Sequence, residues 1–289
     1  MFEKILFPTD FSERADIMLD CVAGMPDVRE VILLHVVKET LHPMGADVVD
    51  TLAKQAAGPA LEQAQRYLRS LNPAIAVSLE TTVAQDITEG IIDASEKSGA
   101  DLIVISAHVR GVKAGLLRGS VPTTLLCRLN KTNILFMRHK IVESLSGVTY
   151  QKFCPLLFHR VLCPTDFSRF SDHATALAGA VKGVGEVIML HVVPEALAGS
   201  EVSELVKEAE AGVSEACKGL AAKGIRCRTL VAKGDPAGGI VKAAEEQDVS
   251  VICISSFGTS CLRDFVLGST VQDVAMKSTR PVLVVRSAQ

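Results

Sequence analysis

The chain has 289 residues and a formal net charge of −3, a length that suits two domains better than one. Its slight acidity and its aromatic content of 4 %, without tryptophan, argue against a nucleic-acid-binding surface, which needs clustered positive charge or stacking rings. No apolar run approaches the roughly 20 residues of a membrane helix, and the start MFEKILFPTD lacks the apolar core of a secretory signal. We therefore expect a soluble, cytoplasmic protein.

The two halves of the chain carry the same motifs in the same order. The matching pairs are ILFPTDFSERAD at 5–16 with VLCPTDFSRFSD at 161–172, VILLHVVKE at 31–39 with VIMLHVVPE at 187–195, and LRGSV at 117–121 with VLGST at 266–270. A collinear repeat of this length predicts two homologous domains, residues 1–141 and 158–289. The segment between them, 142–157, mixes Ser, Gly and Pro without a clear period and is interpreted as a linker.

Apolar runs alternate with helical patterns throughout both halves. In the first half we expect strands at 4–9, 30–37, 75–83, 101–106 and 133–138, with helices at 12–24, 50–70, 86–98 and 119–130. In the second half we expect strands at 160–165, 186–193, 225–232, 249–255 and 281–286, with helices at 168–182, 201–223, 236–247 and 268–278. Strict alternation and near-continuous Val, Ile and Leu in the strands predict the α/β class. The fold would be two tandem, Rossmann-like, doubly wound parallel-sheet domains of five strands each.

The cysteines do not indicate a metal or redox centre. The eight residues are Cys21, Cys127, Cys154, Cys163, Cys217, Cys227, Cys253 and Cys261. No two of them form the C-x-x-C pair of zinc or thioredoxin-like sites. Most lie in apolar runs, so we interpret them as small, reduced, hydrophobic residues.

Several residues of the second half stand where its predicted strands end. In open parallel sheets, ligands bind beyond the carboxyl ends of the strands, near the place where the strand order reverses. We therefore expect a binding site among the residues that end the first, second and fourth strands. These residues are Pro164, Thr165, Asp166, Val192 and Ser255.

A glycine-containing loop, GTSCLRDFVLGST at 258–270, joins the fourth strand to the last helix. Gly268, Ser269 and Thr270 stand at the predicted helix start, where free backbone N–H groups and the helix dipole favour anions. Gly268 has no Cβ to hold phosphate oxygens away from the backbone, and Gly258 would permit a turn with positive φ. A simpler interpretation is a glycine turn followed by a serine N-cap, with no ligand.

Asp and His residues near the strand ends also have structural interpretations. Asp10 and Asp166 each precede a helix, so a plain N-cap role is an alternative to ligand binding for both. His35 and His191 lie near the ends of the second strands, and we interpret them as hydrogen-bonded structural residues rather than catalytic bases.

The glycine loop matches neither widespread phosphate-binding motif. LLRGS and FVLGS lack the lysine of G-x-x-x-x-G-K-[ST]. FPTDFS and CPTDFS occupy the place after the first strand where G-x-G-x-x-G would stand. P-loop hydrolysis and NAD-type redox chemistry are therefore disfavoured.

Together these ordered motifs resemble the universal stress proteins in their tandem form, over nearly the whole chain. The family's nucleotide signature is G-x2-G-x9-G-[ST] after the fourth strand. The second half has Ser255-x2-Gly258-x9-Gly268-Ser269, in which only the first glycine is replaced. The resemblance implies an adenine nucleotide alpha hydrolase-like fold and ATP or AMP as the ligand, with Mg²⁺ accompanying ATP. It also implies dimerisation through the last strand.

The resemblance also implies a role for each matching residue. Asp166 with Thr165 would contact the adenine and ribose side of the nucleotide, and the backbone of Val192 would face the adenine edge. The residues that would hold the ribose and phosphates are Gly258, Gly268, Ser269 and Thr270.

The first half carries a weaker form of the signature. Its aligned positions are Ser106, Val109, Gly119 and Ser120, and Val109 stands in place of the second glycine. A β-branched residue resists positive φ and adds bulk where the backbone should approach the ligand. The matching contact positions are Thr9, Asp10, Val36, Gly119, Ser120 and Val121. We therefore expect the main site in the second half and a weaker or degenerate one in the first.

The leading hypothesis is a regulatory, adenine-nucleotide-binding protein of the stress response. No nucleophile–base pair or carboxylate pair recurs at the strand ends, so efficient catalysis is not expected. Two alternatives stay open: a slow ATP hydrolase of the same superfamily, with Asp166 or Asp264 as the carboxylate that holds a metal, and a nucleotide-free dimeric scaffold. The last strands of the two halves are expected to pair as an internal pseudo-dimer, and the chain to form a homodimer. No nucleic-acid or membrane partner is expected, and the sequence indicates no particular protein partner.

Overall fold

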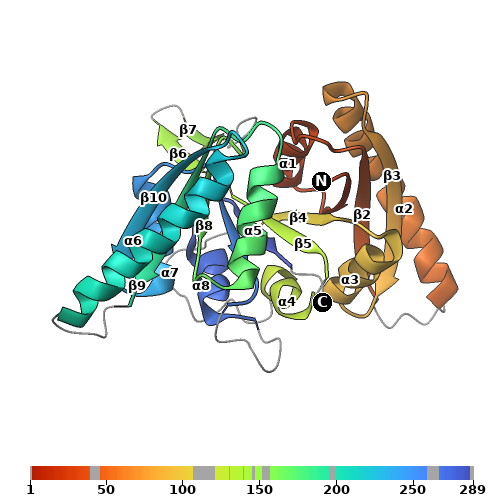
Figure 1. Cartoon of the computed structure of the whole chain (residues 1–289). Helices are drawn as coiled ribbons and strands as arrows, with labels where there is room; N and C mark the ends of the chain where they lie inside the picture. The colour runs from red at the N-terminus through yellow and green to blue at the C-terminus, as the bar shows by residue number, and fades with distance from the viewer. Residues whose placement is uncertain are drawn as a thin grey trace. The chain divides into compact units, whose positions relative to one another are not determined.

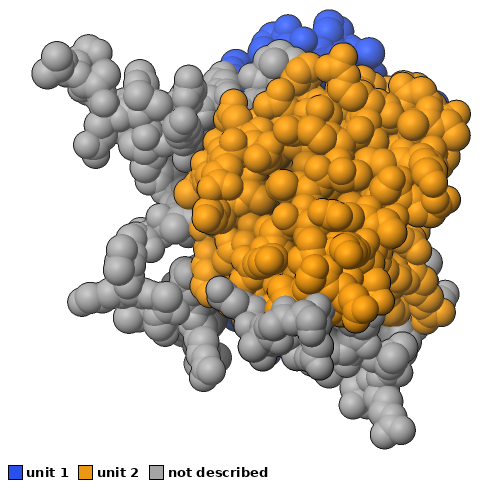
Figure 2. Space-filling model, turned by 60° about the vertical axis from the view of Figure 1, so that its left-hand side comes forward, with its two compact units in different colours: residues 1–106, 112–135 blue, residues 107–111, 136–289 orange. Residues whose placement is uncertain are grey.

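The computed structural model describes residues 2–39, 46–106, 121–129, 131–138, 140–144, 147–151, 157–194, 200–258 and 267–286. The chain divides into two compact units (Figures 1 and 2). The described residues of unit 1 end at Leu135, and unit 2 continues from Phe136. None of the helices within the described ranges combines the length and the hydropathy that a membrane crossing requires.

Unit 1 is built from alternating strands and helices. Its elements are β1 (Lys4–Pro8), α1 (Glu13–Ala23), β2 (Glu30–Lys38), α2 (Ala46–Leu71), β3 (Ala76–Ala84), α3 (Ile87–Ser98), β4 (Leu102–Ser106), α4 (Val121–Arg128) and β5 (Asn133–Met137). The border between the units falls within β5. The predicted elements of the first half are all present, with bounds within a few residues.

Unit 2 repeats the same plan. Its elements are β8 (Arg160–Pro164), α5 (Arg169–Ala180), β9 (Glu186–Val193), α6 (Ser200–Ala221), β10 (Arg226–Lys233), α7 (Pro236–Glu246), β11 (Val251–Ser255), α8 (Ser269–Lys277) and β12 (Val282–Val285). The strands β11 and β12 are buried along their whole length, as predicted for strands covered on both faces. Helices α5 and α6 pack together on one layer, and α7 and α8 form another.

The strands have the same order in the two halves of the chain. The order is β5-β4-β1-β2-β3 in the first and β12-β11-β8-β9-β10 in the second. In unit 2, β8 pairs in parallel with β9 on one side and with β11 on the other. The order therefore reverses at β8, as it does at β1, which pairs with β2 and β4. These are tandem Rossmann-like domains, as predicted.

The segment predicted as a linker contains regular structure. β6 (Lys140–Ser144) and β7 (Gly147–Gln151) form an antiparallel pair in which Ile141 lies opposite Tyr150. A two-stranded hairpin needs only short-range pairing, and the β-branched and aromatic residues of IVES and GVTYQ favour strands. The mixed composition concealed this pattern.

The helices of unit 2 begin in two different ways. Two of them begin with a side-chain cap: α5 is capped by Ser168, and α7 by Asp235, with Pro236 in its first turn. The Oδ2 atom of Asp235 accepts a hydrogen bond from Gly238 N at 2.7 Å. α8 instead begins after Gly268, which provides no capping side chain. Its first N–H groups therefore lack the usual side-chain acceptor.

The cysteines differ in part from the expectation. Cys217, near the end of α6, and Cys227, in β10, form a disulfide bond, and Cys21 is disulfide-bonded as well, so the interpretation of these three residues as reduced is wrong. Cys127, Cys163 and Cys253 are free thiols, and the last two are buried. The pair of Cys217 and Cys227 forms no short motif: the two cysteines are ten positions apart, and they come together only once α6 packs on β10.

Candidate functional site

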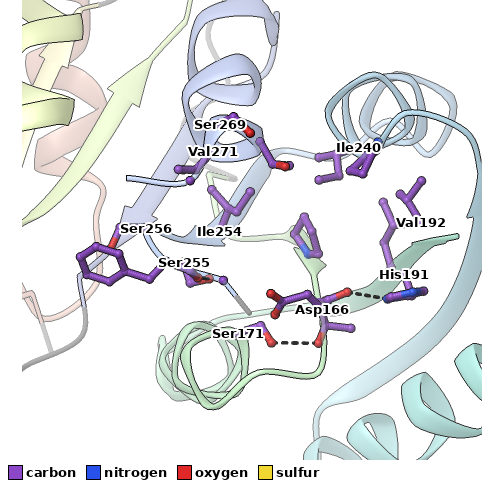
Figure 3. A pocket seen from close by; sticks show the side chains of 18 of the residues that line it. Asp166, Ser171, His191, Val192, Ile240, Ile254, Ser255, Ser256, Ser269 and Val271 are labelled. Carbon is purple, nitrogen blue, oxygen red and sulfur yellow. Dashed lines mark hydrogen bonds between the residues drawn. The ribbon is translucent and has the colours of Figure 1, made fainter. Parts of the chain in front are cut away.

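Unit 2 has a pocket of about 380 Å³ at the carboxyl ends of β8, β9 and β11. This is the point where the strand order reverses, which is the usual ligand position in such sheets. The nine residues predicted for the site in the second half all line it: Pro164, Thr165, Asp166, Val192, Ser255, Gly258, Gly268, Ser269 and Thr270. Figure 3 shows Val192 and Ile240 on one side of the pocket and Ser255 and Ser269 on the other.

The turn after β8 holds itself in place. Phe167 N donates to Thr165 Oγ1 at 2.9 Å, and Ser168 N donates to Asp166 Oδ1 at 3.1 Å. Phe167 has a φ of 59°, a left-handed conformation that costs a non-glycine residue energy. Ser168, not Asp166, is the N-cap of α5, so the simple N-cap alternative for Asp166 is wrong. The carboxylate lies instead at the pocket wall.

His191 has a structural role, as predicted. Its Nδ1 atom donates to the carbonyl oxygen of Thr165 at 2.8 Å, and its ring stacks on Phe167 with 4.6 Å between centroids. Unit 1 repeats the arrangement, since His35 Nδ1 lies 2.9 Å from Thr9 O and stacks on Phe11. The imidazole thus joins the end of the second strand to the turn after the first.

One side of the pocket is apolar. Val192 is 8 % exposed and packs against α7 at Gly239, where an added Cβ would come within 2.9 Å of Val192 Cγ1. Ile240 from α7 continues this surface, and Ile254 from β11 lies on the opposite side, near Ser255 (Figure 3). Such a wall suits the faces of an aromatic base, because binding sites are mostly apolar with a few polar groups.

Ser255 and Ser256, at the end of β11, differ in the hydrogen bonding of their hydroxyl groups. Ser255 Oγ donates to the carbonyl oxygen of Phe257 at 2.7 Å. Ser256 is fully buried, and its Oγ has no hydrogen-bond partner. A buried hydroxyl without a partner typically costs about 1–3 kcal/mol. Ser256 also lines the pocket.

Gly258 is needed for a reason other than the one predicted. Its φ is not among the positive values of the described glycines, so the turn does not use the positive φ that a glycine permits. An added Cβ would instead lie 2.6 Å from Asp166 Oδ2. The glycine therefore lets the loop after β11 approach the turn after β8, and the two together form one end of the pocket.

Gly268, by contrast, is not required by its packing against the described residues. A Cβ at this position would meet Ser256 O and Val271 Cγ1 at 3.9 Å, an ordinary contact distance. Its φ of −64° is available to any residue. Gly268 N donates to Ser256 O at 3.3 Å, which holds the start of α8 beside the loop, and Ser269 and Thr270 follow at the pocket.

Charge is sparse at the described pocket wall. Asp166 is the one lining residue there with an ionisable acidic or basic side chain apart from His191. Within the described ranges, no three His, Cys, Asp or Glu side chains gather as a metal site. Among the described residues, the groups available to an anion are therefore the first N–H groups of α8 and the hydroxyls of Ser269 and Thr270.

In unit 1 the predicted positions are only partly described. Thr9 and Asp10 form the turn after β1, where Phe11 N donates to Thr9 Oγ1 at 3.0 Å and Ser12 N donates to Asp10 Oδ1 at 3.1 Å. Ser12, not Asp10, caps α1. Val36 lies in β2 and Val121 begins α4. Gly119 and Ser120, like Val109, lie outside the described residues.

Sequence reasoning missed about half of the pocket wall. The additional lining residues are Ser171, Leu190, His191, Pro194, Pro236, Ile240, Ile254, Ser256, Phe257 and Val271. Most are apolar residues whose side chains reach the pocket from strands or helix starts. The signal available was their position next to predicted strand ends, which does not by itself separate lining from core residues.

The fold and the pocket define the class of the chain: a tandem Rossmann-like protein with a ligand-sized pocket at a topological switch point. Residues 1–132 and 157–286 each match the model of the Universal stress protein family. The chain therefore belongs to this family, with one family domain in each half.

Curated relatives match one domain at a time. Universal stress protein MJ0577 of Methanocaldococcus jannaschii is 31 % identical over an alignment of 156 residues, and the match covers 45 % of this chain and 96 % of that protein. Universal stress protein YxiE of Bacillus subtilis is 33 % identical over 148 residues, 45 % of this chain and 100 % of that protein. Among solved structures, a universal stress protein from Archaeoglobus fulgidus is similar over 98 % of this chain and 96 % of its own, with a TM-score of 0.70 and 24 % identity. That similarity concerns the fold.

Proposed function

We propose that the pocket of unit 2 binds an adenine nucleotide, ATP or AMP, and that the protein acts in a stress response as a nucleotide-binding regulator. The nucleotide base would lie against the apolar wall of Val192 and Ile240. Its ribose would reach Asp166, and its phosphates would lie at Gly268, Ser269 and Thr270. Membership of the universal stress protein family supports the choice of ligand class.

The start of α8 is the observation that carries this proposal. The helix begins at a glycine that neither its backbone conformation nor its packing against the described residues requires. A glycine of this kind is explained if a ligand occupies the space beside it. The N–H groups behind it have no side-chain cap, and helix starts favour phosphate.

A regulatory role is favoured over efficient catalysis. Proton transfer needs an acid or base within reach of the reacting group. Among the described lining residues, His191 Nδ1 donates to Thr165 O and its ring stacks on Phe167. Asp166 accepts a hydrogen bond from Ser168 N. The nucleotide would instead stabilise one arrangement of the loops. The ratio of its affinities for that arrangement and for the alternative would set how far the equilibrium shifts.

Slow ATP hydrolysis is the second candidate, supported by the carboxylate of Asp166 at the pocket wall. Mg²⁺ would accompany ATP, and the metal would need this carboxylate near the phosphates. Phosphate release measured with ATP, with and without Mg²⁺, separates the two functions. Turnover abolished by Asp166→Asn would favour the hydrolase, whereas binding without release would favour the regulator.

Isothermal titration of the full chain with AMP, ATP and adenosine tests the proposal directly. We expect saturable binding of at least one nucleotide, and weaker binding of adenosine, because the nucleoside has no phosphate for the start of α8. If none of the three bound, and the purified protein released no nucleotide on denaturation, the nucleotide-free scaffold would be the better description.

A further inference from the structure

Arg138 is a buried cation that the sequence motifs do not account for. It follows β5, belongs to unit 2, and is 4 % exposed. It lies outside both ranges that match the family model, 1–132 and 157–286. A buried arginine needs acceptors for its N–H groups, because an unpaired buried charge is costly.

The acceptors of Arg138 are the last carbonyl groups of α8. Its Nε atom donates to Ser278 O at 3.0 Å, and its Nη2 atom donates to Ala275 O. Ser278 is the C-cap of this helix. Nη1 has no hydrogen-bond partner, so both hydrogen bonds of the guanidinium are made to the end of α8.

The charge of Arg138 also matches the polarity of the helix. Burial lowers the pKa of its guanidinium to about 10, which leaves it cationic at neutral pH. A cation at a helix C-terminus is stabilising because the exposed carbonyl groups carry partial negative charge. The nine residues of α8 span about 13 Å at 1.5 Å per residue, so the other end of the same short helix is the pocket wall at Gly268.

We propose that Arg138 is a positioning residue for the anion-binding start of α8. It fixes the C-terminal end of the helix by two hydrogen bonds and one charge, and so holds the N-terminal N–H groups at the pocket. The inference rests on the proposed function for its effect on binding. It also means that the residues needed for the pocket extend beyond the second family-matched range.

The test compares four full-length proteins: the wild type, Arg138→Met, Arg138→Lys and Arg280→Met. Arg280 is the matched control, because it is 7 % exposed and its guanidinium donates to Glu245, Asp248 and the carbonyl oxygen of Val249. Both methionine variants remove a buried cation of unit 2. General loss of stability should therefore appear in both, and displacement of α8 only in the first.

The readout is the ratio of the AMP and adenosine dissociation constants from calorimetric titration. We expect Arg138→Met to reduce the preference for AMP by about fivefold, Arg138→Lys to retain most of it, and Arg280→Met to leave it unchanged. An unchanged ratio in Arg138→Met, or an equal change in Arg280→Met, would overturn the proposal.

A ligand-free measurement separates this inference from the proposed function. Hydrogen exchange of the backbone amides at 269–271 should be faster in Arg138→Met than in Arg280→Met, at temperatures where both are folded. Faster exchange without any nucleotide binding would retain the positioning role and reject the ligand. Equal exchange in the two variants would reject the positioning role, whatever the protein binds.

Discussion

Two glycines of the unit 2 loop look alike in sequence and differ in what they do. The protein's own packing favours glycine at position 258, because a Cβ there would contact the carboxylate of Asp166. Gly268 has room for a side chain in the structure itself. Substitutions at the two positions should therefore separate a folding defect from a binding defect.

Gly268→Val and Gly268→Ala are expected to weaken AMP binding while leaving the fold intact. The alanine methyl would make only ordinary contacts at 3.9 Å, so its effect reports on the ligand. We expect about a tenfold loss for valine, equivalent to roughly 1.4 kcal/mol, and a smaller loss for alanine. Titration calorimetry measures both, with circular dichroism to verify the fold. Unchanged AMP affinity in the valine variant would show that the phosphates do not bind at this end of the pocket.

Gly258→Ala is expected to reduce both stability and binding. The new Cβ would lie 2.6 Å from Asp166 Oδ2, and moving that carboxylate strains its hydrogen bond with Ser168 N. We expect a loss of about 1–2 kcal/mol in the unfolding free energy, measured by urea titration. Gly219→Ala is the control, since nothing lies within 4 Å of its Cβ and alanine favours a helix. Equal stability of the two variants would contradict the close approach.

At the scale of elements, the strand and helix positions follow from the sequence because each appears twice. The repeated apolar runs and the serine caps Ser12 and Ser168 define the same α/β pattern in both halves. What could not be predicted depends on contacts that only the fold creates. The disulfide between Cys217 and Cys227 requires the packing of α6 on β10, and the β6–β7 hairpin has too few residues to show a period.

Removal of the disulfide is expected to lower the stability of unit 2. Substitution of the exposed free thiol of Cys127 is expected to have a smaller effect on the chain. A cross-link between residues ten positions apart restricts a short loop of the unfolded chain, which is worth about 2–3 kcal/mol. The double variant Cys217→Ser/Cys227→Ser should therefore unfold at lower urea than the wild type. Cys127→Ser, at an exposed free thiol, should change the midpoint little. Equal midpoints for all three proteins under non-reducing conditions would contradict the bond.

At the scale of the whole molecule, the duplicated plan does not require two equal sites. The turn after the first strand, with its stacked Phe and His, is the same in both halves. The signature loops differ, since Val109 stands where Gly258 stands in the other half. The sequence could predict the position of the unit 2 site, because strand ends and glycines specify it. It could not predict Ile240 or Ser256, whose part in the wall depends on helix packing and on a buried hydroxyl.

We expect one adenine nucleotide per chain. Native mass spectrometry of the intact protein with excess AMP gives the number directly, and the Gly268→Val variant should lose the bound mass. Two nucleotides per chain would show that Val109 does not prevent binding in the first half. Pairing of the last strands and formation of a homodimer stay predictions, and the same spectra report the number of chains per particle.

The turn PTDFS is closed by its own hydrogen bonds and by a histidine from the neighbouring strand in each half. The turn is therefore a structural feature that needs no ligand. Its presence does not distinguish tandem chains with one binding site from those with two. Because the first half already has this turn, transferring the 255–270 segment to the end of β4 is the shortest engineering route to a second binding site.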